Sequence, residues 1–196
     1  MPWIATIQPG DADEELRAAY DSIVSARGGI ADVHRVQSLN PRALLAHLEL
    51  YKAVIFQRST LARRARERIA VIVSAVNQCA YCIAHHGEAL RRLGEDPLLV
   101  AVLGQGAIPA NLSPAARALL GWAQRAASAP ATCTEDDVSG LRAHGFDDRA
   151  ILDAALTVAY FSFVNRLVLT LGVELEPAFE ATCVPSLAED EQAERR

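Results

Sequence analysis

The sequence predicts an all-α protein. Apolar side chains recur at intervals of three and four residues in most segments, as at Leu44, Leu48 and Tyr51, which places them on one face of a helix. Alanine and leucine supply much of an apolar content of 51%, whereas aromatic residues reach only 6%. No alternation of polar and apolar residues is long enough for a strand, so helices are expected throughout.

Residues that start and stop helices divide the chain into successive elements. Asn40, Asp96 and Ser113 are each followed by a proline, the combination of a capping side chain with a proline at the first helical position. Asp-x-x-Glu and Thr-x-x-Asp patterns fit capping boxes. The predicted helix starts are Asp11, Asn40, Ser59 or Thr60, Asp96, Ser113, Thr134 and Asp147, and the predicted stops are Gly28, Gly94, Gly104, Gly145 and Gly172.

A chain of 196 residues is expected to form one domain. Its predicted parts are N-terminal helices (1–58), a helical hairpin (59–94), C-terminal helices (95–175) and an acidic tail (176–196), solvated over 189–196. A weak internal similarity aligns Asp153 with Glu67 and Asn165 with Cys79, with apolar runs between them in both copies. This suggests an internally duplicated helical hairpin whose second copy lacks thiols, so that Asn165 serves packing or subunit contact.

Composition narrows the function classes. A formal net charge of −5 argues against a nucleic-acid surface, and the apolar content favours a homo-oligomer. No cationic, apolar segment of signal-peptide form opens the sequence, and its longest apolar run (154–164) is too short to span a membrane. We therefore expect a cytoplasmic protein, in which four cysteines are not a disulfide framework. Its arginine run is expected to be a solvated face, formed by Arg63, Arg64, Arg66 and Arg68.

The stretch from Glu67 to His86 carries the chemistry. Cys79 and Cys82 are three residues apart and His86 is four beyond Cys82, so one helical face would hold a dithiol with an imidazole above it. The polar pair at 77–78 favours a chain reversal, and an antiparallel hairpin would bring Glu67 opposite His86. The predicted contacts run from Glu67 through His86 to Cys82 and Cys79. In this arrangement the carboxylate orients the imidazole, and the imidazole takes a thiol proton.

The pattern Glu-x11-Cys-x2-Cys-x3-His resembles the AhpD-like alkylhydroperoxidases of the carboxymuconolactone decarboxylase family, in the branch called uncharacterized peroxidase-related enzymes. The resemblance implies an AhpD-like helical bundle in which Glu67, Cys79, Cys82 and His86 are catalytic and reduce hydroperoxides. It implies that Cys82 attacks and that Cys79 resolves and is more exposed, with an external lipoyl- or thioredoxin-type dithiol as reductant. Helix-dipole reasoning instead favours Cys79 as the thiolate, and this conflict stays open.

Other residues and functions are secondary at this stage. Tyr81 stands where the best-known relatives have a histidine, and with His85 it is a candidate substrate-binding residue. No nucleotide-cofactor signature is present, and no cofactor is expected. The alternatives are a disulfide reductase or redox sensor, a metal site, acid-base decarboxylase chemistry, and a structural oligomer with a vestigial motif. Residues given no chemical role are His34, His47, His144, Cys133 and Cys183, while Trp122, Phe161 and Phe163 are candidates for core, interface or pocket wall.

Overall fold

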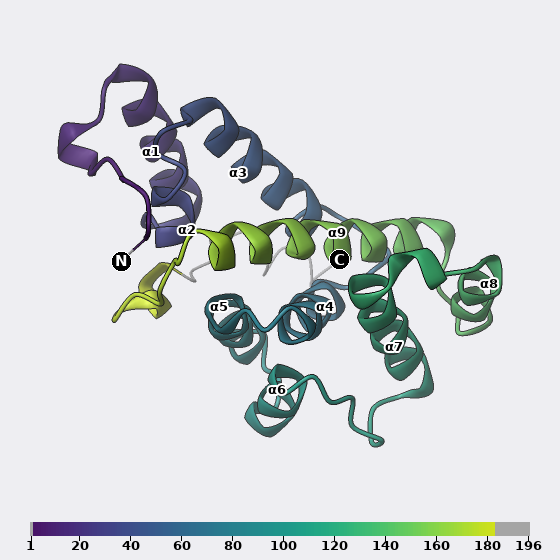
Figure 1. Cartoon of the computed structure of the whole chain (residues 1–196). Coiled ribbons are helices and arrows are strands. Elements are labelled where there is room, and N and C mark those ends of the chain that lie inside the picture. The colour runs from purple at the N-terminus through teal and green to yellow at the C-terminus, as the bar shows by residue number, and fades with distance from the viewer. Residues whose placement is uncertain (1, 183–196) are drawn as a thin grey trace.

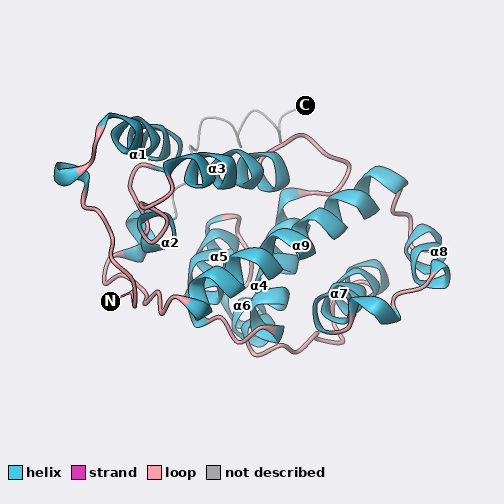
Figure 2. Cartoon of the chain, turned by 45° about the horizontal axis from the view of Figure 1, so that its top comes forward, coloured by secondary structure: helices cyan, strands magenta, loops and turns pink. Residues whose placement is uncertain are grey.

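The computed structural model describes residues 2–182, which form helices joined by loops with no strand in that range (Figure 2). The helices are α1 (Glu14–Arg27), α2 (Asp32–Arg35), α3 (Pro41–Ile55), α4 (Arg63–Val76), α5 (Ala80–Arg92), α6 (Pro97–Gly104), α7 (Pro114–Ser128), α8 (Glu135–Ala143) and α9 (Asp148–Thr170). Short 3-10 turns lie at η1 (Pro9–Asp11), η2 (Pro130–Thr132) and η3 (Phe179–Thr182). The all-α prediction is confirmed.

Helix α9 runs across the molecule and separates two groups of helices. The pair α1 and α3 lies on one side of it, and α4, α5, α6 and α7 lie on the other (Figure 1). A small apolar cluster holds α1 to the first half of α3, and a larger one joins the end of α3 to α4, α5, α6, α7, α8 and α9. The long helix is therefore the shared wall between an N-terminal helical pair and the bundle that contains the cysteine motif.

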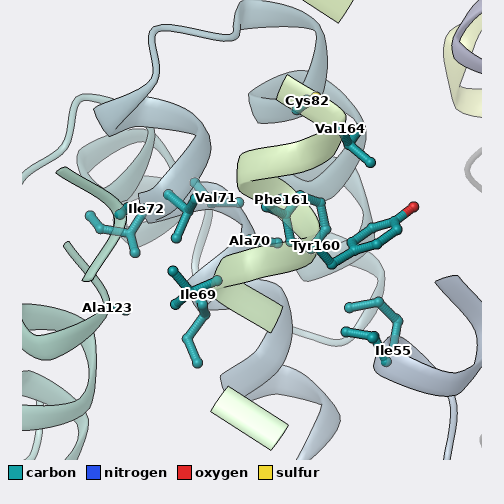
Figure 3. Packing of buried hydrophobic residues seen from close by; sticks show 14 of the residues in the cluster. Ile55, Ile69, Ala70, Val71, Ile72, Cys82, Ala123, Tyr160, Phe161 and Val164 are labelled. Carbon is teal, nitrogen blue, oxygen red and sulfur yellow. The ribbon is translucent and has the colours of Figure 1, made fainter. Parts of the chain in front are cut away.

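Helix α4 is the centre of the larger group. Every residue from Ile69 to Ser74 is buried, and α4 packs against α5, α6, α7 and α9. A helix that is apolar on all sides can be stable in water only when other elements surround it. Figure 3 shows Ile69 to Ile72 of α4 in one buried cluster with Tyr160, Phe161 and Val164 of α9, and Cys82 belongs to the same cluster.

Most predicted helix starts are confirmed. The side chains of Asn40, Asp96 and Ser113 accept hydrogen bonds from backbone N–H groups in the first turns of α3, α6 and α7. The predicted capping box at the start of α8 is present. Three differences stand out: α1 is capped by Asp13 rather than Asp11, α4 begins after Ala62 without a side-chain cap, and α2 was not predicted.

Of the four arginines predicted to form a solvated face, only Arg64 is exposed, so the prediction is wrong for Arg63, Arg66 and Arg68. Arg66 is only 4% exposed and donates to the carbonyl of Val54 at the end of α3, and Arg64 donates to the carbonyl of Leu93 just after α5. Arg68 pairs with Glu95 at 2.6 Å. The last carbonyls of a helix have no partner within it, so these guanidinium groups cap neighbouring helices while their stems cover apolar surface.

The segment after α9 packs along α5. Arg92 of α5 donates to the carbonyl of Glu180, and Arg27 of α1 donates to the carbonyl of Thr182. Residues 176–182 of the predicted tail are therefore anchored to the fold. The predicted solvated end, 189–196, and Cys183 lie outside the described residues.

Helix α9 is long and apolar enough to cross a membrane by length and composition alone. Half of its most apolar stretch is buried inside the fold, as expected for the core helix of a bundle.

Candidate active site

A sharp reversal joins α4 to α5, as the polar pair at 77–78 predicts. Gln78 adopts a positive φ of 58°, and the backbone N–H of Cys79 donates to the carbonyl of Ser74 at 2.8 Å. The left-handed residue is thus Gln78, although Asn77 has the stronger intrinsic preference for that conformation. The turn makes α4 and α5 an antiparallel hairpin with Cys79 at the N-cap of α5.

The hairpin brings Glu67 to His86. One carboxylate oxygen lies 2.7 Å from His86 Nδ1, and the other lies 3.4 Å from a guanidinium nitrogen of Arg63. The Glu67 side chain is 0% exposed. Burial raises the pKa of Glu67, but the charges of His86 and Arg63 outweigh burial and leave this pKa below its ordinary value. Glu67 is therefore a buried carboxylate that holds one nitrogen of the imidazole.

Aromatic side chains fix the plane of the His86 ring. Phe161 of α9 meets it edge-on with ring centroids 4.5 Å apart, and Tyr51 of α3 lies at 6.4 Å. With Nδ1 engaged by Glu67, the nitrogen left to exchange a proton with a substrate or thiol is Nε2. Phe161, a candidate for the core, an interface or a pocket wall from the sequence, thus contacts the imidazole of His86 directly.

The two cysteines of the motif form a close pair. Cys79 Sγ and Cys82 Sγ lie 3.0 Å apart, and both thiols are free. Cys79 is 0% exposed and Cys82 is 2% exposed, so both cysteines are buried and the expected greater exposure of Cys79 is not seen. A sulfenic acid formed on either sulfur would have its partner within reach for condensation to a disulfide.

In the reduced pair of Cys79 and Cys82, the negative charge of a thiolate is more stable on Cys79. Its hydrogen bond with Cys82 lowers its pKa, burial raises it, and the Cys82 backbone N–H and Asn165 amide lower it further, to a net value below normal. The pKa of Cys82 is raised well above its usual value, first by its hydrogen bond with Cys79 and then by burial. Position explains the asymmetry, because Cys79 is the residue at the helix N-terminus.

The predicted contact between His86 and the thiols is not formed. Within residues 2–182, no hydrogen bond joins His86 to either sulfur. Instead Asn165 of α9, which is 0% exposed, lies beside the thiols; its amide donates to the Ser74 hydroxyl at 3.1 Å and accepts from Asn77 at 2.9 Å. The sequence did offer a signal for Asn165, because it is a lone asparagine within an apolar helix. Its assignment to packing or subunit contact missed its position beside the thiols.

Tyr81 and His85 are brought together by the segment after α9. Their rings stack with centroids 4.4 Å apart, and one carboxylate holds both: Glu176 accepts from the Tyr81 hydroxyl at 2.8 Å and lies 3.1 Å from His85 Nε2. Burial raises the pKa of Glu176, but hydrogen bonds from His85 and from backbone N–H groups bring it to about 2. Both candidate substrate-binding residues therefore share one half-buried carboxylate as a partner.

No group of three or more His, Cys, Asp or Glu side chains in the described part of the chain is arranged to hold a metal ion. His86 Nδ1 is already occupied by Glu67. The arrangement that the sequence left open as a zinc site, with Glu67 and an imidazole joining the two thiols, is not formed by these residues.

Two histidines without predicted partners meet near the site. His34 and His47 have ring centroids 5.6 Å apart, and His47 lies between Gln37 and the hydroxyl of Tyr160, at 2.7 Å from each. The Gln37 amide nitrogen also donates to a backbone carbonyl, so it donates to His47 Nδ1 and leaves Nε2–H to donate to Tyr160. This network requires a neutral His47, whose pKa burial lowers to about 4.

The buried neutral His47 predicts acid sensitivity. Its pKa in the folded protein lies below its unfolded value near 6.5, so the unfolded state binds more protons as the pH falls from about 6.5 to 4. We expect the free energy of unfolding to drop across this window, with about 3 kcal/mol due to His47. Urea unfolding at several pH values measures the slope, and His47→Gln, which cannot titrate, should make it shallower. An unchanged slope in that variant would contradict the prediction.

A family model for the carboxymuconolactone decarboxylase family matches residues 41–125, which contain the whole hairpin. The complete chain resembles a crystal structure of the alkylhydroperoxidase AhpD core, an uncharacterized peroxidase-related protein from Ralstonia eutropha JMP134. The two share 27% identity with a TM-score of 0.83, over 94% of this chain and 98% of that one. The complete chain therefore has an AhpD-like fold, and its residues 41–125 match the model of the carboxymuconolactone decarboxylase family.

A second solved structure matches this chain over a similar extent. It is an uncharacterized peroxidase-related protein from Silicibacter sp. TM1040, 28% identical with a TM-score of 0.82, covering 93% of this chain and 96% of that chain. The debrominase Bmp8, solved in complex with 2,3,4-tribromopyrrole, shares the fold at 21% identity and a TM-score of 0.75, over 91% of this chain and 94% of that one. No sequence among functionally curated proteins matches this chain.

Proposed function

We propose that this AhpD-like protein is a thiol-dependent peroxidase that reduces hydroperoxides through a dithiol/disulfide cycle of Cys79 and Cys82. The observation that carries the proposal is the geometry of the hairpin. It holds two free thiols at 3.0 Å and, on the same helix, an imidazole oriented by a buried carboxylate at 2.7 Å. Each of these parts serves a step of peroxide reduction.

The first step forms a thiolate. The proton of the reduced pair passes to His86 Nε2, and the negative charge of Glu67 stabilises the resulting imidazolium. One proton remains shared between the two sulfurs, and its movement across 3.0 Å places the charge on either one. We assign the attack to Cys82, because it lies one helical turn before His86 and the alcohol released there needs a proton.

The second step transfers one oxygen atom. The Cys82 thiolate attacks the terminal oxygen of the hydroperoxide, the O–O bond breaks, and the alkoxide takes the proton from His86, giving a sulfenic acid and an alcohol. The thiol of Cys79 then attacks the sulfenic sulfur and forms the disulfide with loss of water. An external dithiol of lipoyl or thioredoxin type reduces this disulfide by exchange and is itself oxidised.

The proposal is tested by adding a small excess of cumene hydroperoxide to the fully reduced, metal-free protein. The expected products are cumyl alcohol and a protein whose mass is lower by two hydrogen atoms, with the disulfide mapped to Cys79 and Cys82. Should peroxide leave the dithiol untouched while reduced lipoamide exchanges with the oxidised protein, the peroxidase proposal fails. A protein-directed disulfide reductase or redox sensor would then be the better account, and inertness toward both would favour acid-base chemistry.

Glu67→Gln is expected to slow disulfide formation by about 10- to 100-fold. Glutamine can accept a hydrogen bond from His86 but cannot stabilise its positive charge, and partners that orient a functional histidine contribute effects of this size. Stopped-flow measurement of cysteine oxidation gives the rate. Because Glu67 is buried and pairs with His86 and Arg63, its neutral replacement should also lower the thermal midpoint, so the rates are compared at a temperature where the variant is folded.

The matched control for this variant is Glu88→Gln on α5, the helix that carries His86. Glu88 lies at the surface and pairs with Arg91 and Arg92, so its loss should change neither rate nor midpoint by much. If the two variants oxidise equally fast, Glu67 is not part of the relay.

We also propose that the protein acts in the cytoplasm as a homo-oligomer, without nucleic-acid or membrane partners. Several large apolar side chains of α9 are exposed on the single chain, among them Leu152, Leu156 and Phe163. Association would remove such side chains from water. Analytical ultracentrifugation of the reduced and oxidised protein reports the oligomeric state.

A further inference from the structure

A cleft separate from the dithiol lies between α1 and α3. It has a volume of about 450 Å³, within the range typical of small-molecule sites. One wall is apolar and aromatic, formed by Leu48, Tyr51 and Phe56, and the other carries the hydroxyls of Ser22 and Ser25. No role in the peroxidase cycle has been given to this cleft.

Arg27 lines the cleft and is poorly compensated. Its Nη2 donates to the carbonyl of Thr182 at 3.1 Å, and its guanidinium carbon lies 4.7 Å from the centroid of the Tyr51 ring. Its Nε is buried without a hydrogen-bond partner, and no carboxylate among residues 2–182 pairs with it. A partly buried charge without a counter-charge is costly, so a ligand that brings a negative charge to Arg27 would be stabilised there.

The charges of the cleft define the ligand. Its other cation, Lys52, is paired with Glu49 at 2.9 Å, so among residues 2–182 the charge of Arg27 has no acidic partner. One charge matches a carboxylate better than a phosphate dianion, and a guanidinium presents its donors in a fork that fits a carboxylate. The aromatic wall requires that the carboxylate belong to an apolar body.

The cleft shares a wall with the proposed relay. Tyr51, which carries the guanidinium of Arg27 on its ring, is the same tyrosine whose ring lies 6.4 Å from that of His86. Phe56, at the other end of the wall, has Arg63 stacked on it at 4.1 Å, and Arg63 contacts Glu67. A molecule bound to Arg27 therefore lies against the side chains that position the carboxylate and the imidazole.

We propose that this cleft binds a monocarboxylic acid with an apolar body, held by Arg27, and that the preferred hydroperoxide carries such a carboxylate. The second part of this proposal rests on the peroxidase function, whereas the first part is independent of any activity.

Isothermal titration calorimetry on the reduced full-length protein tests the binding site. Octanoate is expected to bind, whereas octanamide, which has the same shape without the charge, and inorganic phosphate should bind at least about 10-fold more weakly. Arg27→Gln should weaken octanoate binding by a similar factor, and Arg27→Lys should retain part of it. Arg42→Gln, an exposed arginine of α3, is the matched control and should bind like the wild type.

The ligand pair keeps the test valid even if Arg27→Gln does not fold, because octanoate and octanamide are compared on the wild-type chain. Equal binding of the two ligands, absence of octanoate binding, or unchanged binding in folded Arg27→Gln would overturn the inference.

A kinetic comparison tests the substrate class. The wild type should prefer cumene hydroperoxide bearing a para-carboxylate over unmodified cumene hydroperoxide in kcat/KM, and Arg27→Gln should reduce this preference by about 10-fold. If neither peroxide is reduced but octanoate binds through Arg27, the peroxidase function fails and the anion site stands. If both are reduced with equal efficiency by the wild type, the substrate assignment fails and the peroxidase function stands.

Discussion

Cys82→Ser is expected to abolish peroxide reduction, with a loss of at least about 10³-fold, the scale seen when an enzyme loses its nucleophile. Serine has no thiolate to attack the peroxide, and its hydroxyl cannot be oxidised to a sulfenic acid. Cys79→Ser should instead consume one equivalent of peroxide and stop. Mass spectrometry should then find one added oxygen atom on Cys82, which a sulfenic-acid reagent such as dimedone can trap.

The opposite pattern would identify Cys79 as the attacking sulfur. The low pKa of Cys79 in the reduced pair provides a physical reason for that outcome, and His86 would then serve the resolving thiol. Cys133→Ser is the control, because this free thiol is only partly buried in a loop after η2 and should leave turnover unchanged. Loss of activity in the control would show that the oxidation is not confined to the motif.

Phe161→Ala is expected to lower the free energy of unfolding by about 3–5 kcal/mol, the range for removing a large aromatic side chain from a core. Phe161 is 0% exposed and packs edge-on against both Tyr160 and His86, with centroid distances of 5.1 and 4.5 Å. The cavity would also release the His86 ring from its plane. Chemical denaturation gives the loss of stability, and cysteine oxidation under native conditions should slow in parallel.

Phe163→Ala makes the same substitution two residues further along α9. Phe163 is 46% exposed and contacts only the rim of the cluster, where its ring meets His47 at 5.5 Å. We expect this variant to lose less than about 1.5 kcal/mol, because nearly half of Phe163 already faces solvent in the single chain. Comparable losses in the two variants would mean that Phe161 is not the packing centre between α4, α5 and α9.

Local sequence determined most of the helices and the central contact of the candidate site. Caps at Asn40, Asp96 and Ser113 act within a single helical turn, so residue type alone predicts them. The contact of Glu67 with His86 was also predictable, because one reversal at residues 77–78 fixes which residues of two successive helices lie opposite each other. Spacing along a helix then placed Cys79, Cys82 and His86 on one face.

Tertiary structure alone decided which distant residues complete the site. Asn165 lies beside the thiols, and Phe161 against His86, because α9 packs on α4, and no spacing rule connects helices so far apart in sequence. The same holds for Glu176, which binds Tyr81 and His85 across the fold.

Burial and charge also depended on the folded chain. The arginines of α4 were predicted to form a solvated face because charged side chains are usually exposed. Arg66 is nevertheless buried, where the end of α3 leaves a carbonyl without a partner. Arg27 and His47 carried no signal in sequence, since the cost of burying a polar group depends on its neighbours. The sequence by itself therefore determined the helical hairpin and its dithiol, and the packing of α1, α3 and α9 around it decided the environment in which they act.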